Sequence, residues 1–275
     1  MKSFLRSVVK VFALLLTVAE LHVVAADSPW SRVVMIGASA SAGFVLTEPF
    51  GGTETAKCKL NHYLDAAITA QHAPVKNLAT ALMFMNPEGF APAQIASLTN
   101  SKPTLVIGVD FLFWFCYGEG STDAERAQRF EQGLKLLEPI PCPLVLGDIP
   151  DASAATNTGI ISIDQVPSEA ARRAANQRLK TWAKSHPQVT VVPLAEFMRA
   201  TMADATIKVH NGTLPAGKTR ALLQADQLHP NPQGATVLSL GILDALVKSQ
   251  KKFSAEEVNW NAKEVLKLGQ VAAAR

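Results

Sequence analysis

Five short apolar runs, separated by longer segments of helical periodicity, constrain the fold of this chain more than any other feature. The runs cover residues 33–36, 75–84, 104–109, 143–147 and 189–193. Residues 123–137, 168–185 and 231–249 carry apolar side chains at helical spacing, and residues 254–257 resemble a capping box that opens a last helix. Strands that alternate with helices are typical of a parallel sheet. The sequence therefore predicts an α/β domain that binds ligands at the carboxyl ends of its strands.

Residues 1–26 differ from the rest of the chain. Three basic residues precede an uncharged apolar run at residues 11–19, and small side chains follow up to Ala26. This order is typical of a cleavable signal peptide, with cleavage expected after Ala26. A membrane anchor is the alternative, but a span needs about 20 apolar residues, and Glu20 ends this run early. We expect a single mature domain, residues 27–275, that is periplasmic or secreted and has no stable membrane span.

The composition excludes several classes of protein. Of the 275 residues 48% are hydrophobic and 18% are charged, which argues against intrinsic disorder. The net charge is only +3, with no dense basic run, so we expect no nucleic-acid partner. Cys58, Cys116 and Cys142 match no zinc pattern and are too few for a disulfide framework. One disulfide bond with a spare thiol and buried free thiols both stay open, and we expect no metal ion or cofactor.

A turn of small residues follows the first predicted strand directly. Residues 37–43 read Gly-Ala-Ser-Ala-Ser-Ala-Gly. Small residues allow a sharp turn that would expose the Ser39 hydroxyl as a nucleophile, provided that a base lies within hydrogen-bond reach. The turn lacks the Gly-Lys-Ser/Thr of a phosphate-binding loop and the glycine spacing of a dinucleotide fingerprint. A purely structural turn is the alternative.

A second motif lies near the C-terminus, where Asp226 precedes His229 by three residues in a turn-rich segment. A carboxylate at this spacing can accept the Nδ1 proton of the imidazole and leave Nε2 free as a base. Taken alone, the pattern equally fits a helix cap beside a surface histidine.

Together the two segments resemble the SGNH (GDSL-type) hydrolase family. Residues 37–43 are similar to its first block, Gly-Asp-Ser-x-x-x-Gly, and residues 226–230 to its last, Asp-x-x-His-Pro. The resemblance implies a three-layer α/β/α sandwich whose five-stranded parallel sheet has flavodoxin-like strand order. It also implies metal-free hydrolysis of acyl esters through an acyl-enzyme. In that reaction Ser39 is the nucleophile and an oxyanion-hole donor, His229 the general base and Asp226 its orienting acid.

The other family blocks are altered. Ala38 stands where the family has an aspartate that supports the loop, and residues 77–81 are the nearest counterpart of the second block. The third block, Gly-x-Asn-Asp, reads Gly-Val-Asp-Phe at residues 108–111, which makes Gly108 and Asp110 candidates for the oxyanion hole or a substrate contact. An ionised Asp110 would repel an oxyanion. We therefore expect either a neutral, donating Asp110 or one that binds a hydroxyl or cation of the substrate.

An aromatic run at residues 111–117 follows the third predicted strand. Such runs pack into the core by default, but the position beside the expected site makes Phe111, Phe113 and Trp114 candidate pocket-wall residues. We expect a serine esterase that acts on a small-molecule ester or an acylated carbohydrate or lipid. The alternatives are a ligand-binding module with little or no catalysis, and a carbohydrate O-acyltransferase with the same three residues.

Overall fold

Five parallel strands form one sheet in the computed structural model, which describes residues 28–118 and 122–274. The strands are β1 (Val33–Met35), β2 (Lys76–Asn77), β3 (Leu105–Gly108), β4 (Leu144–Gly147) and β5 (Val189–Val192). Their order across the sheet is β2-β1-β3-β4-β5. This is the flavodoxin-like order, whose switch point lies between β1 and β3 and marks the ligand-binding edge. The predicted signal peptide, residues 1–26, lies outside the described residues.

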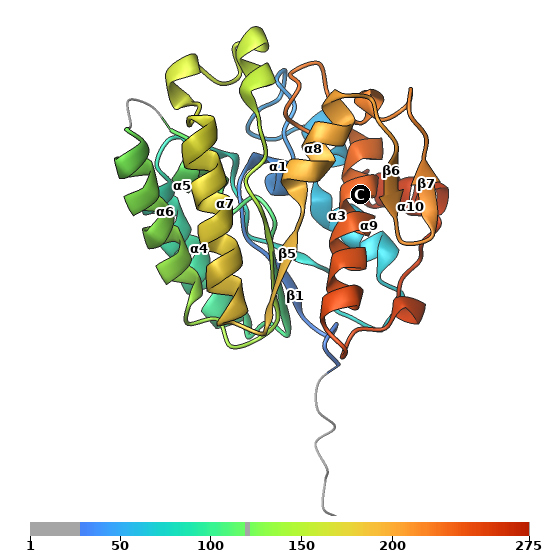
Figure 1. Cartoon of the computed structure of the whole chain (residues 1–275). Helices are drawn as coiled ribbons and strands as arrows, with labels where there is room; N and C mark the ends of the chain where they lie inside the picture. Colours follow the sequence, from blue (N-terminus) through green and yellow to red (C-terminus); the bar gives the residue numbers. More distant parts are fainter. Residues whose placement is uncertain (1–27, 119–121, 275) are drawn as a thin grey trace, which may run out of the picture.

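Helices cover both faces of this sheet, so the chain is a three-layer α/β/α sandwich (Figure 1). One face carries α4 (Pro87–Ser101), α6 (Asp123–Leu137) and α7 (Glu169–Lys184). The other carries α3 (Leu60–Ala67), α9 (Pro232–Ser249) and α10 (Ala262–Ala273). Within the described part of the chain, no helix is both long and apolar enough to cross a membrane.

Shorter elements occupy the connections. They are the helices α1 (Ser39–Ala42), α2 (Thr53–Lys57), α5 (Phe113–Cys116) and α8 (Leu194–Met202), and the hairpin β6 (Ile207–Val209) and β7 (Gly212–Leu214). Short 3-10 helices are η1 (Ala81–Phe84), η2 (Ser153–Thr158), η3 (Ile163–Gln165), η4 (Arg220–Leu222) and η5 (Ala255–Glu257). In Figure 1, α1 and α8 lie near each other at the upper edge of the sheet, where the connections that follow the strands gather.

Strand side chains alternate between two apolar clusters, one on each face of the sheet. In β1, Val34 belongs to the cluster under α4, α6 and α7, whereas Val33 and Met35 belong to the cluster under α3, α9 and α10. Because both faces are covered, most strand positions carry apolar side chains, and β1, β3 and β4 read as continuous apolar runs. The polar exceptions are the edge strand β2 (Lys76–Asn77) and Thr190 of β5.

The strand expected within residues 75–84 is confirmed but short, because only Lys76–Asn77 form β2 and η1 follows at Ala81–Phe84. The expected start of the last helix was wrong. Residues 254–257 do form a capping box, but it opens only the single turn η5, and α10 begins later, after the cap residue Asn261. The reason is that Val258 is extended and forms a β-bridge with Ile68, so η5 and α10 cannot join into one helix.

Candidate active site

Ser39, His229 and Asp226 lie in mutual contact at the carboxyl edge of the sheet, although Ser39 and His229 are 190 residues apart. The Ser39 hydroxyl oxygen lies 2.7 Å from Nε2 of His229, and Nδ1 of the same ring lies 2.8 Å from Oδ2 of Asp226. A carboxylate only accepts, so we assign the proton to Nδ1, and Nε2 then accepts from the Ser39 hydroxyl. This hydrogen-bond chain has the order that a nucleophile, its base and an orienting acid require.

The Asp226 carboxylate is buried and carries three hydrogen bonds. Oδ1 accepts from the backbone N–H groups of Leu228 and His229, each at 3.0 Å, and Oδ2 accepts from the imidazole. Burial raises the pKa of Asp226, but the bond and charge of His229 together with the two backbone donors outweigh it, so the pKa lies below its ordinary value. The carboxylate therefore keeps the negative charge that favours an imidazolium beside it.

The His229 ring is held from its face as well as from its edges. Phe44 stacks on it with ring centroids 4.2 Å apart and planes inclined by 28°. The side-chain amide of Gln224 donates to the carbonyls of Phe44 at 2.7 Å and Pro230 at 3.0 Å, and the Gln224 backbone N–H donates to the carbonyl of His229 at 2.9 Å. Gln224 thus joins the segment after α1 to the loop that carries His229.

The turn that carries Ser39 is held by the side chain of Asp110. Oδ1 accepts from the Ala38 N–H at 3.0 Å and from the Ser41 hydroxyl at 2.6 Å, and Oδ2 accepts from the Ser41 N–H at 3.1 Å. Gly37 makes this approach possible, because a Cβ at that position, where φ is +148°, would lie 2.1 Å from Oδ1. The turn is therefore built around a buried acceptor.

For Asp110 we expected either an oxyanion-hole donor or a contact to the substrate. In the structure its carboxyl group accepts from three donors of the turn, and the residue also lines the cavity beside Ser39. An acceptor-only carboxylate suits three donors. The loop support that the family resemblance assigns to position 38 comes here from Asp110, since Ala38 contributes only its backbone N–H.

The remaining backbone of the turn is also fixed. Gln94 of α4 pairs with both polar groups of Gly37, accepting from its N–H at 2.7 Å and donating to its carbonyl at 2.9 Å. Asn77, at the start of the stretch considered for the second block, donates to the carbonyl of Ser41 at 2.9 Å. Ser39 and Ala40 open α1, and the first N–H groups of a helix have no acceptor within it. Their two N–H groups are accordingly candidates to bind an anion formed at Ser39.

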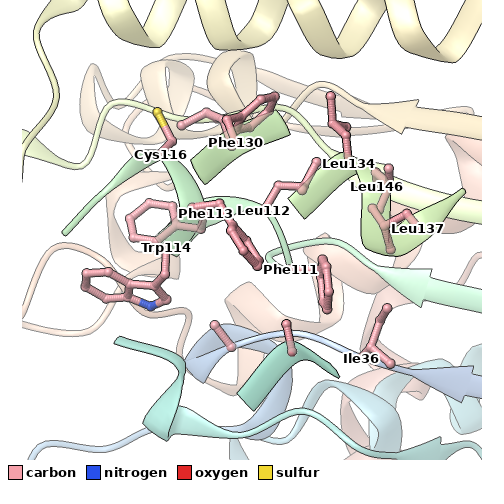
Figure 2. Close-up of a cluster of buried hydrophobic side chains, with 14 of the residues drawn as sticks. Ile36, Phe111, Leu112, Phe113, Trp114, Cys116, Phe130, Leu134, Leu137 and Leu146 are labelled. Carbon is pink, nitrogen blue, oxygen red and sulfur yellow. The ribbon is translucent and has the colours of Figure 1, made fainter. Parts of the chain in front are cut away.

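A cavity of about 120 Å³ adjoins Ser39 and His229. Its wall consists mainly of apolar side chains from α8, α9 and the ends of β3 and β4. Of the three aromatic residues expected there, only Phe113 lines it. Phe111 and Trp114 lie among the buried side chains of the cluster under α4, α6 and α7 (Figure 2). Gly108 also lies outside the cavity wall, packed within β3 against Ile36.

Four residues that support the site were not predicted from the sequence. Each acts through a partner that is distant in the sequence or through the backbone; they are Ser41, Phe44, Gln94 and Gln224. Ser41 alone had a signal, because it belongs to the small-residue turn.

The three cysteines are free thiols. Burial raises the pKa of Cys58 to about 11 and that of Cys116 to about 12, and it also raises the pKa of Cys142. A thiol of this kind is a poor nucleophile near neutral pH. Among the described residues, no group of three or more His, Cys, Asp or Glu side chains is arranged to hold a metal ion.

No family model and no curated protein matches this chain. Among solved structures it is similar to the YxiM protein of Bacillus subtilis, at 18% identity and a TM-score of 0.47, over 80% of this chain and 56% of that one. It is also similar to a Bacteroides fragilis protein described as a "putative acylhydrolase", at 16% identity and a TM-score of 0.46, over 81% and 92% of the two chains. The chain thus spans little more than half of the Bacillus subtilis protein, and the case for a function rests on the geometry of the site.

Proposed function

We propose that this protein is a serine esterase that hydrolyses acyl esters through an acyl-enzyme on Ser39. The observation that carries the proposal is the hydrogen-bond chain from the Ser39 hydroxyl through His229 to Asp226, with contacts of 2.7 and 2.8 Å. Hydroxyl, imidazole and carboxylate in this order form the constellation that activates a serine on unrelated folds.

The proposed reaction has two halves. In the first, Ser39 Oγ bonds to the carbonyl carbon while its proton passes to Nε2 of His229, and the imidazolium then protonates the departing alcohol as the ester bond breaks. In the second, a water molecule loses its proton to Nε2 and attacks the acyl carbon. The bond to Ser39 then breaks, Ser39 recovers its proton, and a carboxylic acid leaves. Asp226 holds the ring orientation and stabilises the imidazolium in both halves.

The negative oxygen formed in each half needs donors. We assign this role to the N–H groups of Ser39 and Ala40, which open α1 at the cavity. Asp110 supports catalysis in this proposal because it holds the turn that carries Ser39.

Export is part of the proposal. It rests on the basic and apolar pattern of residues 1–26 and on the small residues before Asp27. N-terminal sequencing of the protein recovered from the periplasm or the medium should begin at Asp27. A protein that keeps its first 26 residues inside the cell would contradict export and leave the esterase proposal intact.

A fluorophosphonate probe tests the chemistry, because it reacts with activated serines and marks the residue attacked. We expect the label on Ser39, and we expect Ser39→Ala to abolish both labelling and turnover of p-nitrophenyl esters. Ser185→Ala, a change at a serine outside the site, serves as the matched control and should keep both. Labelling at another residue, or unchanged turnover in Ser39→Ala, would exclude the proposed mechanism.

A further inference from the structure

The apolar side chains that line the cavity beside Ser39 are only partly covered by the rest of the chain. Leu194, Phe197 and Met198 of α8 face it from one side, and Val237 and Leu238 of α9 from the other. All five side chains are only half-buried. Concave apolar surface next to reactive groups is typical of a small-molecule site.

The polar side chains of this cavity outside the triad each have at least one partner within the fold. The Thr201 hydroxyl donates to the carbonyl of Phe197 at 2.8 Å, and Asp148 accepts from the N–H of Ala195 at 2.7 Å. Asp110 is bound to the turn around Ser39. The wall between α8 and α9 therefore offers hydrocarbon contact rather than hydrogen bonds to a sugar or a charged group.

We infer that this cavity holds the hydrocarbon chain of the acyl group, which makes the protein selective for butanoyl and hexanoyl esters over acetyl esters. The inference rests on the proposed function and specifies its substrate class. The cavity of about 120 Å³ has room for a short hydrocarbon chain.

The acyl group fits this cavity better than the alcohol. In the second half of the reaction, water must reach the acyl carbon from the side that the alcohol left, because His229 serves both. An apolar pocket is a poor route for water. The acyl chain remains bound through both halves, so it gains most from a wall that excludes water.

Phe197 lines the cavity from α8 and also packs against α9. Its ring packs on Gly241 of α9, where an added Cβ would lie 2.7 Å from Cζ of the ring. A methyl group at Gly241 would therefore push the ring toward the cavity, while a smaller side chain at position 197 would lengthen the cavity. The two changes act in opposite directions without touching the triad.

The test compares kcat/KM for p-nitrophenyl acetate, butyrate, hexanoate and octanoate. In the unmodified protein we expect a gain of about four-fold per methylene up to butyrate or hexanoate, the value expected for burial of one methylene. Gly241→Ala should move the optimum toward acetate, and Phe197→Leu toward octanoate. Leu238→Ala gives a second enlarged variant should Phe197→Leu fold poorly. Phe253→Leu, a buried change outside the cavity, should leave the preference unaltered.

A parallel series keeps the acyl group as acetyl and lengthens the alcohol. Activity that rises with alcohol length and changes in the Phe197 and Gly241 variants would assign the cavity to the alcohol and overturn the inference. The inference would also be overturned if p-nitrophenyl acetate had the highest kcat/KM, or if the variants changed kcat/KM by the same factor for all esters. In each of these cases Ser39-dependent turnover persists. Failure of the proposed function is distinct, because no ester would then be turned over in a Ser39-dependent manner.

Discussion

The ring of Phe44 lies against the imidazole of His229 at 4.2 Å, although the two residues come from opposite ends of the chain. Gly43 makes this possible. It has φ +80°, and a Cβ there would lie 2.7 Å from the carbonyl oxygen of Thr55 and 2.8 Å from Cγ of Lys59. The segment after α1 therefore turns tightly over α2 and brings Phe44 onto the face of the base.

The stack predicts a catalytic effect for Phe44. An aromatic face stabilises a cation, so it favours the imidazolium that forms in both halves of the proposed reaction. Aromatic pairs contribute about 0.5–1.5 kcal/mol, and Phe44→Ala should therefore lower kcat roughly two- to ten-fold. Phe44→Tyr keeps the ring and should stay near the original rate. A loss confined to KM would show that Phe44 contacts substrate rather than His229.

Gln224 should position the base through its two carbonyl contacts. Gln224→Glu keeps the shape of the side chain but removes the N–H donors to Phe44 and Pro230. Each lost bond leaves a carbonyl unpaired, so we expect a lower kcat and a slower reaction with fluorophosphonate. Gln250→Glu is the matched control, because it also removes an amide-to-carbonyl bond, to Pro187, but far from the site. Equal losses of kcat in the two variants would show that Gln224 has only a structural role.

Asp110 and Ser41 should behave as one unit. In Asp110→Asn, one oxygen becomes an NH₂ group that must face a donor of the turn, which costs about 1–3 kcal/mol. Ser41→Ala removes one donor only and should cost less. The double variant tests the link, because contacting residues show coupling energies of roughly 0.5–3 kcal/mol in urea unfolding. Additive losses would separate the two residues and contradict the arrangement.

The sequence predicted the parts of this molecule that depend on local patterns. Apolar runs located the sheet, since both of its faces are covered, and Ser39, Asp226 and His229 belong to short motifs with a chemical meaning. The support of the site could not be predicted in the same way. Gln94 meets Gly37 across 57 residues and Gln224 meets Phe44 across 180. Such contacts exist only once the layers have packed.

The cavity wall shows the same limit. The aromatic run after β3 is the natural candidate for a wall, but the short helix α5 carries most of its rings under α4 and α6. One side of the wall comes instead from α8. Its nine residues follow β5 directly, and Pro193 before them has no side chain that could cap a helix. The order of the strands places both segments at one edge, and only side-chain packing decides which of them faces the cavity.

The free cysteines lead to a prediction about which reagents inactivate the proposed enzyme. The sulfur of Cys58 lies 3.8 Å from the side-chain nitrogen of Gln224. Burial raises the pKa of this thiol to about 11, so little thiolate is present near neutral pH. Iodoacetamide should therefore leave ester turnover intact under conditions in which a fluorophosphonate abolishes it. The measurement is residual activity together with the mass of the treated protein. Inactivation that tracks alkylation of Cys58 would show that this thiol opens to solvent.

Asp226 makes the stability of the fold depend on pH in a defined direction. Despite its burial, its hydrogen bonds and the charge of His229 keep its pKa in the folded chain below the ordinary value of about 3.9. A group with a depressed folded pKa stabilises the fold above its unfolded pKa and loses that contribution as pH falls through the folded value. The contribution should thus be complete above about pH 5 and decline below about pH 4.

Asp226→Asn isolates this contribution, because an amide does not titrate while the other carboxylates remain in both proteins. The difference in free energy of unfolding between the two, measured by urea titration, should be largest near neutral pH and shrink below about pH 4. Ester turnover should fall by roughly 10⁴-fold at every pH where the unmodified protein is active, since the amide no longer fixes the Nδ1 proton. A stability difference that stays constant down to acid pH would mean that the carboxylate is not held ionised by the contacts around His229.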